Sequence, residues 1–104
     1  NLYFSLDKIV ENLKNRDKDE FFYENEKKNI HIFKDKIVYK TDEILYKIEF
    51  ENKKMYISDT ENKSNFGSRT VISNLENLEF EKIGEILVIK IKNFGKDEIR
   101  VVKI

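Results

Sequence analysis

The sequence contains no cysteine, proline or tryptophan, one histidine and only three glycines. Without cysteine the chain forms no disulfide, has no thiol nucleophile and builds no cysteine-type zinc site. The residues also show no glycine-rich phosphate loop, no nucleophile elbow and no paired-carboxylate motif. We therefore predict a protein that is not an enzyme, has no catalytic residues and needs no cofactor.

No apolar run approaches the roughly 18–20 residues that would span a bilayer. Charge of neither sign dominates, because Lys and Arg total 20, Asp and Glu total 20, and the net charge is zero. Nucleic-acid-binding domains usually carry a basic surplus, so we expect no nucleic-acid partner. Alanine and glutamine are absent while Lys, Ile and Asn are abundant, which is typical of an AT-rich genome such as that of a low-GC Gram-positive bacterium.

What is present is sufficient for one domain. A chain of 104 residues buries about 60–65% of its unfolded surface, enough for a single core. The first five residues, NLYFS, resemble the recognition site of a tag-removing protease and are interpreted as a tag remnant. The single globular domain is therefore expected to span residues 6–104.

One helix is predicted at the start of this domain. Leu6, Ile9, Val10 and Leu13 recur at i, i+3, i+4 and i+7, which places them in one narrow apolar stripe. The helix is expected over residues 6–18, with the stripe as its buried face.

From Phe21 onward the apolar residues alternate with a period of two, which predicts strands. Short polar segments separate these runs at hairpin spacing, so we expect about seven antiparallel strands over residues 21–104. The segment Glu85–Lys92 is apolar on both faces, since Ile86 and Val88 oppose Leu87 and Ile89, and is expected to be a central strand. The other strands are expected within 29–33, 37–40, 43–50, 54–58, 70–73, around 78–80 and within 97–104.

These elements predict an α+β fold in which the N-terminal amphipathic helix packs on the antiparallel sheet. One apolar helix stripe and one dry sheet face bury each other most simply by direct contact. The charged face of the hairpin Val38–Ser58 is left open, facing either solvent or a neighbouring subunit. The residues expected at the helix–sheet contact are Leu6, Ile9, Val10, Leu13, Ile44, Tyr46, Ile48, Phe50, Leu87, Ile89 and Ile91.

Few residues suggest chemistry. His31 alternates with Ile30 and Ile32 and is expected on the surface of a strand. Tyr46 and most other aromatic residues are in phase with the apolar face and are expected in the core, whereas the pattern leaves the phase of Tyr39 and Tyr56 open.

The polar segment Asp59–Ser68 is predicted to be a loop. Its oxygen ligands, Asp59, Glu61 and Asn62, are weak candidates for a calcium site. Lys63 stands where a further ligand would be needed and repels a cation, so we expect a solvated loop and no metal.

Three short patterns now suggest a family. A helix is followed by Ile37-Val38-Tyr39, by Leu45-Tyr46-Lys47, and by Ser73–Lys92, where Leu78 and Phe80 lead through a turn into a long apolar strand. In this order the chain resembles the globular part of type IV pilin-like proteins. The similarity is to minor pilins of the PilW kind, to the J-type pseudopilins of type II secretion and to the competence pilin ComGF. The positions that carry it are Tyr39, Leu45, Tyr46, Lys47, Leu78 and Phe80.

The resemblance implies a non-enzymatic structural subunit of a pilus, or of a related secretion or competence fibre. Its partners would be other pilin subunits, and an upstream apolar helix would anchor it in the cytoplasmic membrane before it joins a fibre at the cell surface. The family's short leader and its apolar helix with an early glutamate are not among these residues. Residues 6–18 are then expected to be the C-terminal half of a longer helix.

Two other functions remain open. The chain is also compatible with a surface-displayed adhesin or ligand-binding β domain, and with an intracellular interaction domain. The sequence upstream of residue 6 distinguishes them: a processed leader and apolar helix, a cleavable signal peptide, or a polar start.

Overall fold

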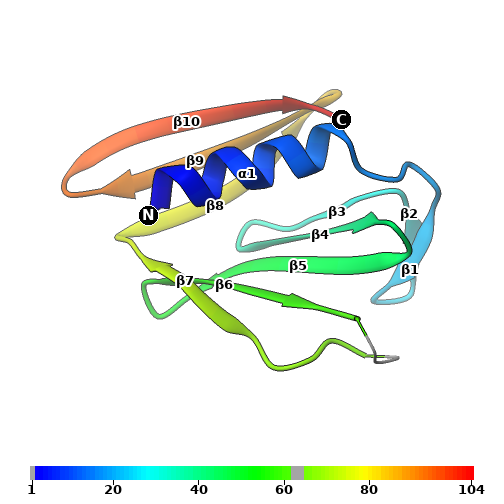
Figure 1. Cartoon of the computed structure of the whole chain (residues 1–104). Coiled ribbons are helices and arrows are strands. Elements are labelled where there is room, and N and C mark those ends of the chain that lie inside the picture. The colour runs from blue at the N-terminus through cyan, green and yellow to red at the C-terminus, as the bar shows by residue number, and fades with distance from the viewer. Residues whose placement is uncertain (1, 62–64) are drawn as a thin grey trace.

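The computed structural model describes residues 2–61 and 65–104, and in these residues it shows one helix followed by ten strands (Figure 1). The strands form three antiparallel sheets: a two-stranded hairpin β1-β2, a five-stranded sheet β3-β4-β5-β6-β7 and a three-stranded sheet β10-β9-β8. The elements are α1 (Leu2–Lys14), β1 (Phe21–Tyr23), β2 (Glu26–Lys28), β3 (His31–Ile32), β4 (Lys36–Thr41), β5 (Ile44–Glu51), β6 (Lys54–Asp59), β7 (Thr70–Asn74), β8 (Asn77–Ile83), β9 (Ile86–Asn93) and β10 (Lys96–Lys103).

Helix α1 begins at Leu2, four residues before the predicted start, and buries a stripe of Leu2, Leu6, Ile9 and Leu13. It ends at Lys14, four residues before the predicted boundary. Hydrogen bonds from the two residues after Asn15 hold the chain at this point. The guanidinium of the buried Arg16 donates to the carbonyl oxygen of Leu13 at 3.1 Å, which satisfies one of the open carbonyls of the last turn. The next residue, Asp17, donates its backbone N–H to the carbonyl oxygen of Lys40 at 2.8 Å and leads the chain to the sheet.

Tight turns set the register of the five-stranded sheet. Asn52 and Lys53 have φ values of 52° and 59°, and Asp42 and Glu43 have values of 49° and 67°. Two consecutive residues with positive φ match the twist of the strands that they join. As a result Ile48 of β5 lies opposite both an isoleucine of β4 and an isoleucine of β6.

One hydrophobic core joins the helix to both larger sheets. Helix α1 lies against β10 and β7, while β8 crosses β3, β4 and β5, so the helix and the three-stranded sheet together cover the dry face of the five-stranded sheet (Figure 1). The core consists of Leu2, Leu6, Ile9, Leu13, Ile30, Ile37, Tyr39, Ile48, Met55, Leu75, Leu78, Phe80, Leu87, Ile89, Ile91 and Val102.

The prediction of an α+β chain with an N-terminal helix and antiparallel strands is confirmed, but a single sheet of about seven strands is wrong. The sheet divides after β7. Leu75 donates its backbone N–H to the carbonyl oxygen of Lys53 in the first sheet at 3.1 Å, and Glu76 donates to that of Lys92 in the second at 3.0 Å. Leu75 itself is buried, so a single step around it moves the chain from one sheet to the other.

Most residues expected at the helix–sheet contact lie in this core. Leu6, Ile9, Leu13, Ile48, Leu87, Ile89 and Ile91 are buried, and Val10, Tyr46 and Phe50 are partly buried against the cluster. Ile44 is the exception: it begins β5 beside the β4–β5 turn, is only half-buried, and lies outside the cluster.

Candidate interaction surface

The outer face of the five-stranded sheet is partly covered by the chain itself. Val38 and His31 lie opposite each other on this face and are 0% and 2% exposed. The β1–β2 hairpin lies over them: the rings of Phe21 and Tyr23 lie 4.8 and 5.6 Å from the imidazole ring. His31 donates from Nε2 to the carbonyl oxygen of Phe21 at 3.0 Å. The prediction of a surface histidine is therefore wrong, because it did not foresee this hairpin.

Lysines on this face are held by aromatic rings. The ammonium of Lys36 lies 4.9 Å from the ring centroid of Phe33 and 3.0 Å from a carboxylate oxygen of Glu24. Burial alone would lower the pKa of Lys36, but its contacts with Tyr23 and Glu24 outweigh that effect and raise the pKa. Each such cation–π contact stabilises by about 0.5–1 kcal/mol at an exposed site. The charged face of the predicted hairpin is thus partly occupied from within the molecule.

Phe66 and Arg69 extend this cover. Both residues lie in the segment before β7. The ammonium of Lys47 is 4.5 Å from the ring centroid of Phe66. The guanidinium of Arg69 stacks 3.9 Å from the ring centroid of Tyr56 and forms an ion pair with Glu51 at 2.6 Å. Tyr56, whose phase the sequence left open, therefore points outward under an arginine.

The outer face of the three-stranded sheet is different, because a group of apolar residues on it is exposed. Ile83, Ile86, Ile99 and Val101 are 55%, 41%, 58% and 55% exposed, and Val88 between them is half-buried. We call these five residues the apolar stripe. Val88 pairs with Val101, and Ile86 with Ile83, so the stripe is continuous across the strands. The prediction that β9 is a central strand is confirmed, but its second apolar face has no cover among the described residues.

Charged residues border the apolar stripe. Lys90 forms an ion pair with Glu81 at 2.8 Å, and the hydrogen bond from this carboxylate raises the pKa of the lysine. An exposed apolar patch with a polar rim is typical of a surface that binds another protein. This face is the candidate functional site of the molecule.

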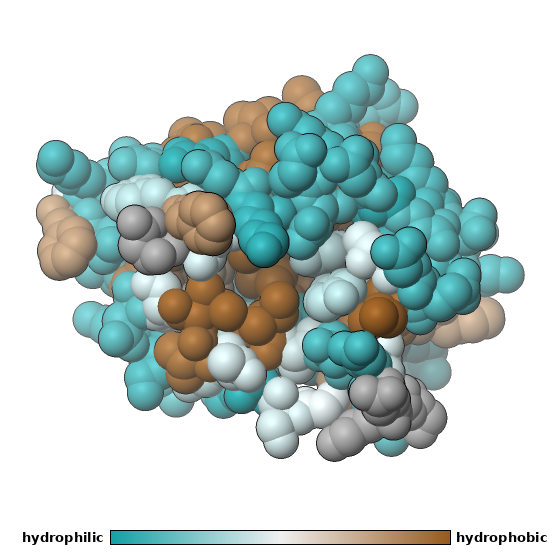
Figure 2. All heavy atoms as spheres, viewed as in Figure 1, coloured by the Kyte–Doolittle hydropathy of each residue, from teal (hydrophilic) through white to brown (hydrophobic). Residues whose placement is uncertain are grey.

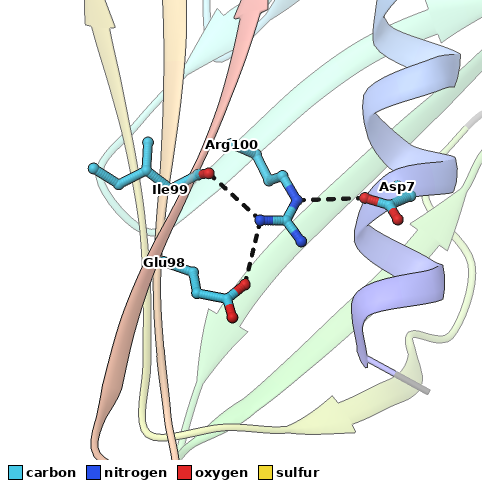
Figure 3. Close-up of polar contacts among 4 residues, drawn as sticks. All are labelled: Asp7, Glu98, Ile99 and Arg100. Atoms are coloured by element: carbon cyan, nitrogen blue, oxygen red, sulfur yellow. Dashed lines mark hydrogen bonds and ion pairs between the residues drawn. The ribbon is translucent and has the colours of Figure 1, made fainter.

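Arg100 links the same sheet to the helix (Figure 3). Its side chain points from β10 toward α1, where Nε lies 3.3 Å from Asp7, and Nη1 lies 3.3 Å from Glu98. The same nitrogen donates to the carbonyl oxygen of Ile99 at 3.4 Å. Asp7 and Arg100 are 93 positions apart, so no local sequence pattern indicates this contact.

A groove lies between α1 and strands β6 and β7. It has a volume of about 190 Å³ and is lined by Ile9, Asn12, Tyr39, Ile57 and Ile72, among others. Figure 2 shows apolar residues gathered in this hollow. The hydroxyl of Tyr39 is buried and makes no hydrogen bond of full geometry with a described residue; burial raises its pKa to about 12, although a contact with Asn12 acts in the opposite direction. Tyr39, whose phase was also open, is therefore a core residue beneath the groove.

A polar hollow adjoins the β1–β2 hairpin. Tyr23, Glu24, Glu26, Lys28 and His31 line it, and its volume is about 130 Å³. Glu26 is paired with Lys28 at 2.8 Å, and Glu24 is held by a lysine of β4. These carboxylates therefore form ion pairs with neighbouring lysines in an exposed hairpin.

The calcium candidates do not converge in the described part of the chain. Asp59 accepts a hydrogen bond from the backbone N–H of Glu61 at 3.1 Å and so closes a local turn, while Asn62 lies outside the described residues. Within 2–61 and 65–104, no three His, Asp or Glu side chains are grouped as metal ligands would be. Over the same ranges, no helix is long and apolar enough to cross a membrane.

The six positions that carry the family resemblance divide between the two faces of their strands. Tyr39 and Tyr46 stack in the core with ring centroids 5.7 Å apart, and Leu78 and Phe80 are buried in β8. Lys47 lies on the outer face beneath Phe66, and Leu45, of the same face, is half-buried. Four of the six therefore serve packing.

No protein-family model, curated protein or solved structure matches this chain significantly.

Proposed function

We propose that this protein is a non-enzymatic assembly subunit, a minor pilin or pseudopilin domain of a type IV pilus or of a related secretion or competence fibre. The observation that supports this function best is the apolar stripe on the outer face of the three-stranded sheet. A small domain that leaves a continuous group of apolar side chains on one sheet face, with no cover among the described residues and with charged residues around it, is suited to packing against a protein neighbour.

The placement of the helix agrees with this role. Helix α1 is held on its apolar side by β10 and β7, and Arg100 ties it to β10 through Asp7. A force or a movement applied along α1 would therefore be passed directly to the three-stranded sheet. In the proposed subunit an apolar helix upstream of Leu6 anchors the protein in the membrane before assembly and packs in the fibre core afterwards.

The partners in this proposal are other pilin subunits, and the location is the cell surface. The decisive experiment is to isolate the protein from its native cells, together with fibres sheared from their surface, and to determine its N-terminus by mass spectrometry. We expect a processed, N-methylated, apolar segment upstream of Leu6 and recovery in the fibre fraction. A mature protein with a polar start, found only inside the cell, would reject the proposal in favour of an intracellular interaction domain.

The role of the apolar stripe can be tested in the same cells. Replacing both Ile99 and Val101 by lysine should remove the protein from the fibre fraction, because two charges would have to be buried at the contact. Phe22→Lys is the matched control, since Phe22 is an exposed apolar residue on another sheet. Equal incorporation of both variants would show that the stripe does not contact a neighbour.

The groove beside α1 favours a second candidate, a surface-displayed ligand-binding domain. Its largely apolar lining, with the polar side chain of Asn12 beside it, has the properties of a site for a small apolar ligand with one polar group. This candidate predicts a cleaved signal peptide with small residues at the cleavage site in place of the methylated apolar segment.

A further inference from the structure

The free edges of the two larger sheets are not equivalent. Strand β7 is short and pairs with β6 through a β-bulge, which disturbs its edge. The edge of β8 meets the other sheet, where Phe80 donates its backbone N–H to the carbonyl oxygen of Lys34 at 2.9 Å. Strand β10 spans Lys96–Lys103, pairs only with β9 among the described strands, and forms the upper border of the molecule in Figure 1.

The phase of the β9–β10 ladder shows which backbone groups face this edge. Ile104 donates its N–H to the carbonyl oxygen of Glu85 at 2.8 Å and continues the register of the two strands. Because hydrogen-bonding groups alternate along an antiparallel strand, even-numbered residues of β10 bond to β9 and odd-numbered residues point away from it. The N–H and C=O groups of Asp97, Ile99, Val101 and Lys103 therefore face the free edge, and all four residues are exposed.

The side chains of these four residues are complementary to themselves in reverse order. If a second β10 lies antiparallel beside the first with Arg100 opposite Arg100, then Asp97 faces Lys103 of the second copy and Ile99 faces its Val101. Each pairing joins two residues whose backbone groups face the edge, so every such group finds a partner. Shifting the register by two residues keeps the hydrogen-bonding phase but separates Asp97 from Lys103, so charge selects one register.

We propose that a second copy of this chain pairs with the β10 edge, in the antiparallel register centred on Arg100. The pair joins two three-stranded sheets into one continuous sheet and makes the two apolar stripes adjacent. Antiparallel cross-strand pairs of opposite charge and of branched aliphatic residues are each stabilising. Isologous contact of the same strand on both subunits closes the assembly at two copies.

The two Arg100 side chains meet at the centre of this contact. Each guanidinium is already held by Asp7 and Glu98, so every copy brings one positive and two negative charges to the centre (Figure 3). The carboxylates offset the repulsion that two free arginines would cause. Salt that weakens these ion pairs should therefore weaken the dimer as well.

This inference rests on the proposed assembly role, because it names a partner for the same sheet, but the two can fail separately. Self-association is a property of the purified chain. The processing of the N-terminus in native cells does not depend on it.

Sedimentation measurements from about ten micromolar to about one millimolar cover the affinity expected for a small contact. We expect a monomer–dimer equilibrium in the unaltered chain. Lys103→Asp places aspartate opposite Asp97 twice and should weaken the dimer about tenfold. The double variant Asp97→Lys with Lys103→Asp restores both ion pairs and should restore the dimer, while Lys53→Asp, in the β5–β6 turn, is the matched control and should not change it.

A chain that stays monomeric throughout this range overturns the proposal. So does a double variant that is no better than Lys103→Asp, or a series of open-ended oligomers in place of a dimer. Circular dichroism of each variant checks that it is folded.

Cysteine variants test the register without altering charge. The chain has no cysteine of its own, so a single introduced thiol reports only its own neighbours. Residues 99 and 101 of opposite copies would have Cα atoms about 5.5 Å apart, a distance that suits a disulfide. A mixture of Ile99→Cys and Val101→Cys chains should cross-link on mild oxidation much faster than either chain alone; equal rates in all three samples would exclude this register.

Discussion

The two larger sheets share one core but differ in the treatment of their outer faces. On the five-stranded sheet the outer face carries charged residues, and yet Val38 and His31 are sealed beneath the β1–β2 hairpin. On the three-stranded sheet the outer face carries the apolar stripe, and yet Ile99 and Val101 are more than half exposed. Polarity of a strand face therefore does not reveal whether the chain covers it. Cover depends on whether a further segment reaches the face, and no described segment covers the apolar stripe.

Both larger sheets pack on one hydrophobic core together with α1. Leu13→Asp should destabilise the protein by about 4–5 kcal/mol, because Leu13 is fully buried between the helix and both sheets and aspartate would bring an unpaired charge there. Lys8→Asp, on the exposed side of α1, is the control and should cost well under about 1 kcal/mol. Urea unfolding followed by circular dichroism measures both; an unchanged midpoint for Leu13→Asp would show that α1 does not pack on the sheets.

The packing of the β1–β2 hairpin over the five-stranded sheet should contribute to the free energy of unfolding. Phe21→Ala should cost about 3 kcal/mol, since Phe21 is buried against His31 and its removal leaves a cavity over the five-stranded sheet. Phe22, the next residue, is exposed and supplies a matched control, so that Phe22→Ala should change the free energy of unfolding by less than about 0.5 kcal/mol. If the two substitutions cost the same, the hairpin does not seal the face.

Tyr39 lies beside Val38 on β4, and its burial in the shared core should make the free energy of unfolding depend on pH. Burial raises the pKa of its hydroxyl to about 12, so above pH 10 the unfolded chain loses this proton more readily than the folded protein does. The free energy of unfolding is therefore unaffected by this group below the pKa of the unfolded chain. It falls by about 2 kcal/mol in total as the pH rises from that value to the pKa of the folded protein.

The variant Tyr39→Phe should lose this alkaline contribution, which unfolding curves at pH 9 and at higher pH would show. At neutral pH it should be about as stable as the original, because the hydroxyl makes no hydrogen bond of full geometry with a described residue and only a contact with Asn12 would be lost. An identical pH dependence in both proteins would mean that the hydroxyl reaches water.

The sharpest test makes one substitution on both outer faces. Val38→Thr should cost about 1–2 kcal/mol, because Val38 is fully buried and the new hydroxyl would lack a partner. Val101→Thr makes the same change on the exposed face and should alter the free energy of unfolding by no more than about 0.5 kcal/mol. Equal costs in thermal or urea unfolding would contradict the contrast between the two sheets.

Periodicity predicted the parts of this molecule that repeat locally. The stripe of Leu6, Ile9 and Leu13 has helical spacing, the turn at Asn52 and Lys53 separates two alternating runs, and β9 is apolar on both sides. Each signal lies within one element or one hairpin, where the pattern of burial is set by neighbouring residues.

The rest depends on contacts that no local pattern contains. The β1–β2 hairpin has strands of three residues, too short for alternation to be recognised, and its cover over His31 was therefore missed. The division of the sheet occurs within the pair Leu75 and Glu76, which looks like any other strand boundary. The sequence predicts part of the candidate surface, because Ile86 and Val88 form a second apolar face of β9. Only the topology shows that no described segment covers this face.

The turns of the five-stranded sheet have one more consequence. Glu43 and Lys53 adopt left-handed backbone conformations with φ of 67° and 59°, where a residue with a side chain is less stable than glycine by about 1 kcal/mol. The fold accepts this strain because hairpin geometry demands it at those positions. For a protein engineer, these turns offer sites at which glycine could improve heat tolerance while both outer faces keep their chemistry.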